Sequence, residues 1–173
     1  MTHVTAPCVV RHYTLTTSTV WGQQTLQPTD WRAALRKRVV ILEDEEAIRF
    51  FLWYFFDRRG YEVFTFPEPG LCPLHIAPGC PCPEGTSCAD IVISDVNMEG
   101  KNGLDYIEKL VGKGCKQRHF ALMSGAFSAA DLLRAMHLGC ALFSKPIEMD
   151  ALKTWVEVVE ESIPPERQLH NWA

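Results

Sequence analysis

Five polar residues of the chain could together handle a phosphoryl group and a metal ion. Each of them follows a short apolar run: Glu43, Asp44, Asp95, Ser124 and Lys145. Three carboxylates that lie close together repel one another unless a cation or a proton intervenes. A hard divalent cation takes oxygen ligands, and Mg²⁺ suits a site with few carboxylates and room for phosphate oxygens. The three acidic residues therefore predict a magnesium site.

The other polar residues complete the same chemistry. Lys145 would bring a compact positive charge to a phosphoryl oxygen or to Asp95, and Ser124 would bring one hydroxyl donor. A carboxylate can itself act as the nucleophile and form an acyl phosphate. The predicted reaction is transfer of a phosphoryl group onto Asp95, with Mg²⁺ and Lys145 neutralising the charge that develops.

Short apolar runs rich in β-branched residues predict the buried parallel strands that would position these side chains. The expected strands cover residues 39–42, 61–66, 91–93, 120–123 and 141–143. Apolar residues at helical spacing alternate with them and predict helices over residues 45–59, 104–112, 128–138 and 152–163. This alternation predicts an α/β fold with a doubly wound, five-stranded parallel sheet. Ligands of such folds bind beyond the carboxyl ends of the strands, where the five polar residues would meet.

Two of the expected helices carry further information. Ser128, with Asp131 three residues later, has the pattern of a helix-capping box. The helix over residues 45–59 places Phe51 on its core face, whereas Phe50 and Trp53 point the other way. That second aromatic face is either covered by the N-terminal segment of the same chain, through Trp21 or Trp31, or a docking surface for a partner.

Composition limits the classes of protein that fit. The chain has 173 residues and a net charge of −4, which argues against binding to nucleic acid by charge alone. Its mean hydropathy is −0.05, and no apolar run is long enough for a membrane span. Residues 1–20 lack the apolar core of a signal peptide, so we expect a cytoplasmic protein. The expected organisation is a poorly ordered extension (1–37), one domain (38–163) and a C-terminal tail (164–173).

Four segments, in order and each at a strand end, carry a family resemblance. They are VVILEDEEAIR (39–49), IVISDVNMEGKNGLDYI (91–107), FALMSGA (120–126) and LFSKPIEMDAL (142–152). With them, residues 38–163 resemble the receiver domain of bacterial two-component response regulators. The resemblance implies a flavodoxin-like (βα)₅ fold with strand order 2-1-3-4-5.

The resemblance also implies roles for the acidic residues. Asp95 would be the phosphoacceptor, and Asp44 and Asp95 would bind Mg²⁺ directly. Glu43 would bind it through water, and the backbone carbonyl of Asn97 would complete the protein ligands. Gly103 would follow Asn102 in the turn before the third helix, where a glycine tolerates positive φ.

The remaining implied roles concern the conformational switch. Ser124 would be the switch hydroxyl, and Lys145, in a cis bond to Pro146, would contact the phosphoryl group. The family's switch aromatic precedes this lysine by three residues, where the chain has Leu142. Phe143 is offset by one position and would point to the opposite face of its strand, so a switch role for it competes with packing in the core.

The segment between the second and third expected strands departs from the family. Prolines at 67, 69, 73, 78, 81 and 83 exclude a regular helix through most of it. The same segment holds a cluster of potential metal ligands: Cys72, His75, Cys80, Cys82 and Cys88. Their spacing matches no standard zinc pattern, which leaves three interpretations: reduced and partly buried thiols, a structural metal, or a disulfide or redox switch.

The sequence favours a single-domain response regulator that takes its phosphoryl group from a phosphohistidine. The donor would be a sensor histidine kinase or a histidine phosphotransfer protein, and the output would be contact with a downstream protein. Catalysis would be limited to self-phosphorylation and self-dephosphorylation, so we do not expect an enzyme in the ordinary sense. Two alternatives are a metal- or redox-sensing module on the same scaffold and an aspartyl-phosphate phosphatase. Asn97 counts against the phosphatase, which needs a second carboxylate there.

Overall fold

A five-stranded parallel sheet forms the centre of the molecule. The computed structural model describes residues 36–80 and 82–170. The strands of this sheet are β1 (Arg38–Leu42), β2 (Glu62–Phe66), β4 (Ile91–Asp95), β7 (Phe120–Ser124) and β8 (Ala141–Ser144). Their order is β2-β1-β4-β7-β8, and every neighbouring pair is parallel. Counted along the chain this is 2-1-3-4-5, so the predicted doubly wound fold is confirmed.

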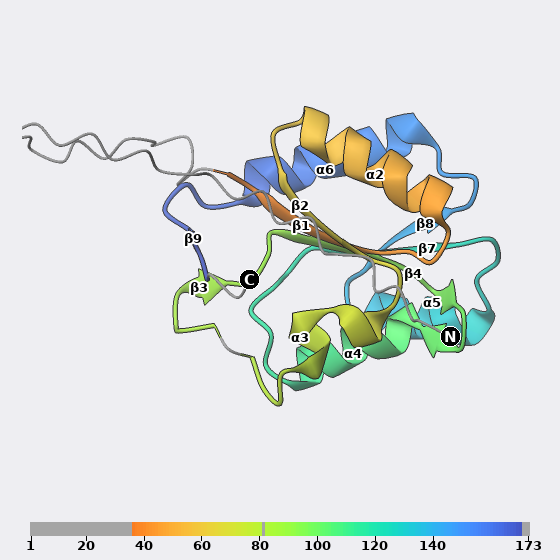
Figure 1. Cartoon of the computed structure of the whole chain (residues 1–173), viewed down its shortest axis with the longest axis horizontal. Coiled ribbons are helices and arrows are strands. Elements are labelled where there is room, and N and C mark those ends of the chain that lie inside the picture. The colour runs from red at the N-terminus through yellow and green to blue at the C-terminus, as the bar shows by residue number, and fades with distance from the viewer. Residues whose placement is uncertain (1–35, 81, 171–173) are drawn as a thin grey trace, which may run out of the picture.

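Helices cover both faces of the sheet. Figure 1 shows α2 (Glu46–Arg58) and α6 (Met149–Ser162) on one face, and α3 (Pro73–Ile76), α4 (Gly103–Gly112) and α5 (Ala129–His137) on the other. Successive residues of β1 alternate between two cores: Val39 and Ile41 pack toward α2 and α6, and Val40 and Leu42 toward α4. A strand buried on both faces needs apolar side chains at every position, which explains the continuous apolar runs in the sequence. Among the described residues, no helix is long and apolar enough to cross a membrane.

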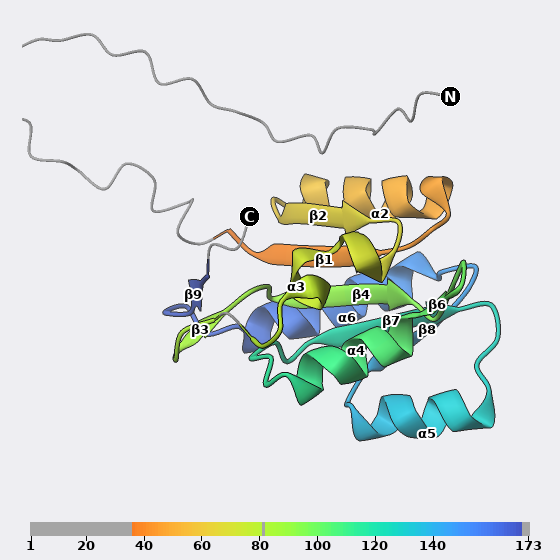
Figure 2. The same ribbon diagram turned by 60° about the horizontal axis from the view of Figure 1, so that its bottom comes forward.

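The register of the strands brings their carboxyl ends together. Leu42, the last residue of β1, pairs with Ser94, and Asp95 at the end of β4 pairs with Met123. Ser124 pairs with Ser144, the residue before Lys145. Figure 2 shows α2 along one side of the sheet and α4 along the other. The sheet edge that the sequence predicts as the site is therefore formed.

The proline-rich segment forms only short helical pieces. A 3-10 turn, η1, covers Pro69–Leu71, and α3 is a single turn over Pro73–Ile76. Pro69 and Pro73 each begin a helical piece, where proline is tolerated because its missing N–H would have no helical partner. Leu74 of α3 is buried in the core beside α4. From there to β4, the described residues form only the two-residue strand β3 (Thr86–Ser87), as the prolines predict.

Both ends of the described chain pack against the sheet. The backbone carbonyl of Lys37 accepts a 2.8 Å hydrogen bond from the Glu62 N–H. At the other end, β9 (Gln168–Leu169) pairs with β3, and the Arg167 guanidinium forms an ion pair with the buried carboxylate of Asp90. Most of the predicted C-terminal tail thus adds to the domain. The predicted N-terminal extension, with Trp21 and Trp31, lies outside the described residues up to residue 35.

The predicted capping box of α5 is confirmed. The Ser128 hydroxyl accepts a hydrogen bond from the Asp131 N–H, and the Asp131 carboxylate accepts one from the Ser128 N–H. Replacing Ser128 with alanine should lower the free energy of unfolding by about 1 kcal/mol, because helix donors lose their acceptor. Urea denaturation measures this change. Thr154→Ala is the control, because it deletes an exposed hydroxyl that bonds the Asp150 carbonyl inside α6. An equal loss in both variants would contradict the capping role.

Two further short strands follow β4. They are β5 (Asn97–Met98) and β6 (Lys101–Asn102), which pair antiparallel and form a small hairpin between Asp95 and α4. Asn102 is also the N-cap of α4, and its side-chain oxygen accepts from the N–H groups of Leu104 and Asp105. The hairpin holds the loop after Asp95 in a defined conformation beside the sheet edge.

Candidate functional site

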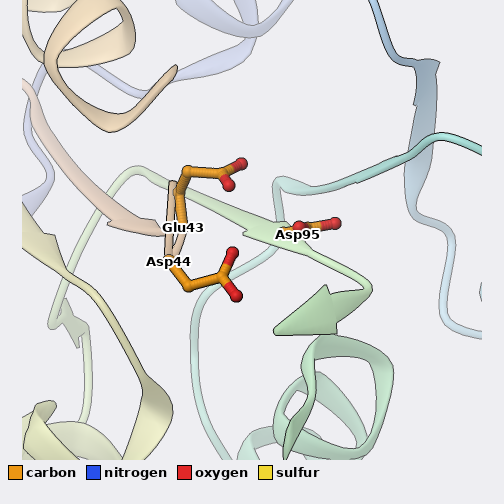
Figure 3. Close-up of side chains that lie close together, drawn as sticks. All are labelled: Glu43, Asp44 and Asp95. Atoms are coloured by element: carbon orange, nitrogen blue, oxygen red, sulfur yellow. The ribbon is translucent and has the colours of Figure 1, made fainter. Parts of the chain in front are cut away.

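Three carboxylates meet at the carboxyl ends of β1 and β4. Figure 3 shows Glu43 and Asp44 directly after β1, next to Asp95 at the end of β4. Their ligand oxygens lie within 4.8 Å of one another, as the sequence predicts. Glu43 is fully buried and Asp95 is 5 % exposed, whereas Asp44 faces solvent. The site is open to solvent on the side of Asp44 and closed on the side of Glu43.

Lys145 is the cation of the site. Its Nζ lies 2.7 Å from Oδ2 of Asp95 and 2.8 Å from Oε2 of Glu43. The backbone positions it: the Lys145 N–H donates to the Ser124 carbonyl at 2.8 Å, and the bond to Pro146 is cis, as predicted. Burial lowers the pKa of Lys145, but hydrogen bonds to Asp95 and Glu43 outweigh this effect and raise it overall. The amine therefore stays charged.

Charge in the site is unbalanced without a further cation. Three carboxylates against one ammonium group leave two negative charges. Burial raises the pKa of Glu43, the hydrogen bond from Lys145 lowers it, and the charge of Asp95 raises it again. A divalent cation would balance the excess, and carboxylate and carbonyl oxygens are the donors that Mg²⁺ prefers. The residues present fit Mg²⁺.

Ser124 and Asn97 lie on the other side of Asp95. The Asn97 N–H donates to Oδ1 of Asp95, and the side-chain amide of Asn97 donates to the Ser124 hydroxyl, each at 3.2 Å. The Ser124 hydroxyl itself donates to the Ala126 carbonyl at 2.8 Å and is fully buried. Ser124 is thus near the carboxylate of Asp95 without a hydrogen bond to it. The structure brings together every residue predicted for the acidic site.

Two positioning residues of this site were missed or misinterpreted from the sequence. Arg49 of α2 donates to the backbone carbonyls of Glu43 and Asp44, at 2.7 and 3.0 Å, and so fixes the loop that carries both carboxylates.

The positive φ predicted for Gly103 is wrong. Among the described residues, the glycines with positive φ are Gly60, Gly85, Gly100, Gly114 and Gly139. A side chain at Gly103 would instead collide with the backbone of Asp95. A close approach, and not a turn conformation, requires this glycine.

Phe143 is not part of the acidic site. It is 8 % exposed and packs with Trp155 of α6, at a centroid distance of 5.6 Å, in the core on the α2 and α6 side. Leu142 packs on the opposite side of the sheet. The one-residue offset therefore gives Phe143 a packing position, as the alternation of strand side chains implies. In α2, Phe51 is 40 % exposed, so the predicted core face of that helix is narrower than expected.

The predicted cysteine and histidine cluster is only partly assembled. The Cys72 sulfur lies 3.3 Å from the Tyr106 hydroxyl, inside the core. His75 stacks on the Tyr106 ring, and its Nε2 lies 3.2 Å from the Lys109 amine. Both residues are engaged elsewhere and do not join the other cysteines of the segment. Cys80, Cys82 and Cys88 instead lie near Cys115, which the sequence does not mark as a member of the cluster.

Comparisons with known proteins agree with this site. Residues 39–157 match the family described as response regulator receiver domain. The transcriptional regulatory protein PdtaR of Mycobacterium tuberculosis is 30 % identical over 132 residues, which are 75 % of this chain and 60 % of PdtaR. The match thus spans about 60 % of the length of that relative.

Solved structures of receiver domains share the fold. The receiver domain of HemR from Leptospira biflexa has a TM-score of 0.62 at 23 % identity, covering 76 % of this chain and 99 % of that one. Chemotaxis protein CheY4 of Vibrio cholerae has a TM-score of 0.57 at 20 % identity, covering 72 % and 98 %. The response regulator receiver domains, the family that residues 39–157 match, act in two-component signalling. With its family match over most of its length, the chain belongs to the response regulator receiver domains.

Proposed function

We propose that Asp95 accepts a phosphoryl group from a phosphohistidine of a sensor histidine kinase or a phosphotransfer protein. The observation that carries this proposal is the position of Asp95, between the Lys145 ammonium at 2.7 Å and the solvent-facing carboxylate of Asp44. One Asp95 oxygen would attack phosphorus, the bond from phosphorus to the histidine nitrogen would break, and the imidazole would leave. The product is an acyl phosphate on Asp95.

Each neighbour of Asp95 has a defined task in this proposal. Asp44, Asp95 and the backbone carbonyl of Asn97 would hold Mg²⁺, with Glu43 acting through water. The bound cation would neutralise charge on the phosphoryl oxygens. The Lys145 ammonium, which now contacts two carboxylates, would turn to a phosphoryl oxygen. The Ser124 hydroxyl would exchange its bond to the Ala126 carbonyl for another phosphoryl oxygen.

The switch would follow from these two movements. Ser124 ends β7, and Lys145 directly follows β8, so a change in either side chain acts on the loop before α5 and on β8. Phosphorylation would shift a pre-existing equilibrium between two arrangements of α5 and β8. Leu133 and Met136 of α5 are 64 % and 72 % exposed, which makes this helix the natural contact for a downstream protein.

The phosphate donor would dock over the start of α2. A hollow of about 250 Å³ lies there, lined by Ala47, Ile48, Phe51, Lys145, Pro146 and Ile147. Lys145 thus lines both this hollow and the acidic site. Phe51, which lines the hollow, is 40 % exposed, and its neighbour Phe50 on the same helix is 63 % exposed. An apolar helix that carries a phosphohistidine could cover these side chains and bring its phosphoryl group to Asp95.

Beryllium fluoride with Mg²⁺ tests this proposal, because it imitates a phosphoryl group on a carboxylate. We expect NMR shift changes in the loop after β7, in α5 and in β8. Asp95→Asn should abolish them, since an amide is neither a nucleophile nor an anionic ligand. Asp57→Asn, which neutralises an exposed carboxylate on α2, should respond like the unmutated protein. No response of the unmutated protein, or an undiminished response of Asp95→Asn, would refute the proposal.

The phosphatase alternative lacks support in the site. Its mechanism needs a general acid two residues after the nucleophile, and Asn97 offers only an amide there. That amide is occupied by the Ser124 hydroxyl. The arrangement therefore favours a phosphoacceptor over a phosphatase.

A further inference from the structure

Four cysteines from three segments lie close together on the α4 side of the sheet, away from the acidic site. Cys80 and Cys82 come from the loop after α3, Cys88 lies just before β4, and Cys115 follows α4. The sulfurs of Cys88 and Cys115 are 3.7 Å apart. Cys82 is buried in the same core cluster as Cys88, and Cys80 and Cys115 pack against that cluster. The four cysteines therefore lie together in one group, the cysteine ring.

Backbone contacts hold the segments of this ring against one another. The Cys80 N–H donates to the Lys113 carbonyl at 3.2 Å, which places the loop at the end of α4. The Lys113 amine donates to the carbonyls of His75 and Ala77 and ties α3 to the same place. The ring lies beside the core on the α4 side: Cys88 is 1 % exposed, Cys82 is 9 % exposed, and the other two thiols are half-buried.

We propose that Cys80, Cys82, Cys88 and Cys115 bind one Zn²⁺ ion in a structural site. A tetrahedral zinc ion with Zn–S bonds of about 2.3 Å separates its sulfurs by roughly 3.8 Å. The Cys88–Cys115 distance already matches one edge of that tetrahedron. Four sulfur ligands without a carboxylate in the ring select zinc over Mg²⁺ or Ca²⁺. Closed sites with four protein ligands are typical of structural rather than catalytic zinc.

The ring must tighten to hold the ion. Among the described residues, only the acidic triad has three ligand atoms all within 4.8 Å of one another, so the thiols are more widely spaced than in a loaded site. The loop with Cys80 and Cys82 is the part that would move, because its described residues between α3 and β3 belong to no helix or strand. Cys88 and Cys115, whose sulfurs are already 3.7 Å apart, would be the two ligands that do not need to move.

A bound zinc ion would stabilise the segment between β2 and β4. Among its described residues, the segment between β2 and β4 has only two short helical pieces, η1 and α3, so few backbone hydrogen bonds hold it in place. A zinc ion would join the second half of this segment, at Cys80, Cys82 and Cys88, to the residue that follows α4 closely, Cys115. Metal binding in such sites contributes directly to folding free energy. The ion would thus replace the packing that a full helix would provide.

Metal content of the full-length protein, purified without chelator, is the first test. We expect about one zinc per chain in the unmutated protein and in Cys140→Ser, whose thiol is half-buried and outside the ring. Cys115→Ser should lose the zinc and unfold at a lower temperature. Zinc retained by Cys115→Ser, or only traces in the unmutated protein, would overturn the proposal. A Cys88–Cys115 disulfide, found by peptide mapping of protein kept free of reductant, would overturn it as well.

Cobalt provides a second test that does not depend on the folding of a variant. Zinc-stripped unmutated protein is titrated with Co²⁺ under reducing conditions. One equivalent should produce thiolate-to-metal charge transfer and the intense d–d bands of tetrahedral coordination, and added Zn²⁺ should remove them. The acidic triad has only oxygen ligands and cannot produce the charge-transfer band. A titration without that band refutes the thiolate site and leaves the phosphoacceptor proposal untouched.

Discussion

Replacing Gly103 with alanine is expected to destabilise the domain by about 3 kcal/mol or more. A Cβ atom at this position would overlap the backbone oxygen of Asp95 and the hydroxyl of Ser94, and would lie 2.9 Å from the Asp95 carbonyl carbon. Both neighbours belong to β4, the central strand of the sheet, where close packing leaves little room to shift. The substitution must therefore push α4 away from β4 or displace Asp95.

Urea denaturation of a matched pair tests this prediction. Gly112→Ala lies in the same helix, and nothing stands within 4 Å of the Cβ it would add. This control should stabilise the protein by roughly 0.5–1 kcal/mol, because alanine favours the helix more than glycine does. Opposite signs for the two variants support the close approach of α4 to Asp95. A Gly103→Ala protein as stable as the unmutated one would show that the approach is not needed.

Replacing Lys145 with methionine should cost about 3 kcal/mol of stability at neutral pH. The side chain of Glu43 is fully buried, and Lys145 is its cationic partner at 2.8 Å. Without the ammonium group, Glu43 and Asp95 would face each other with no positive charge between them. Because the site would then be more negative, Mg²⁺ should stabilise the variant more strongly than it stabilises the unmutated protein.

A double-mutant cycle separates this charge effect from lost packing. Glu43→Gln keeps the shape of the side chain and removes its charge, so Lys145→Met should cost clearly less in that background. Lys153→Met, on the exposed face of α6, is the control and should change stability little. The measurements are thermal unfolding with and without Mg²⁺. An equal cost of Lys145→Met in both backgrounds would contradict the role of the Glu43–Lys145 pair.

Local patterns of the sequence predicted most of the architecture. The β-branched run at residues 39–42 can be buried on both sides, so it indicates a central parallel strand without further information. Ser128 and Asp131 satisfy their own helix end, and this local bonding is visible in the sequence. The acidic site was predictable for a related reason: parallel strands place all their carboxyl ends on one edge of the sheet, so residues far apart in sequence become neighbours.

Features that depend on how the helices pack could not be predicted in this way. Cys115 lies 27 residues from Cys88, and the two meet only because α4 packs against the sheet. Cys72 lies closer in sequence but points to Tyr106 in the core. The need for Gly103 arises from the distance between α4 and β4, which no turn pattern encodes. Arg49 likewise looks like an ordinary exposed helix residue until its two carbonyl partners are known.

Localisation of a covalent phosphoryl group tests the central claim most directly. The full-length protein is incubated with Mg²⁺ and acetyl phosphate, and the modified residue is identified by mass spectrometry of its peptides. We predict one phosphoryl group per chain, carried by Asp95, absent when a chelator removes Mg²⁺ and lost on treatment with hydroxylamine, which cleaves acyl phosphates. A phosphoryl group on any other residue, or none on Asp95 with Mg²⁺ and donor present, would contradict the account.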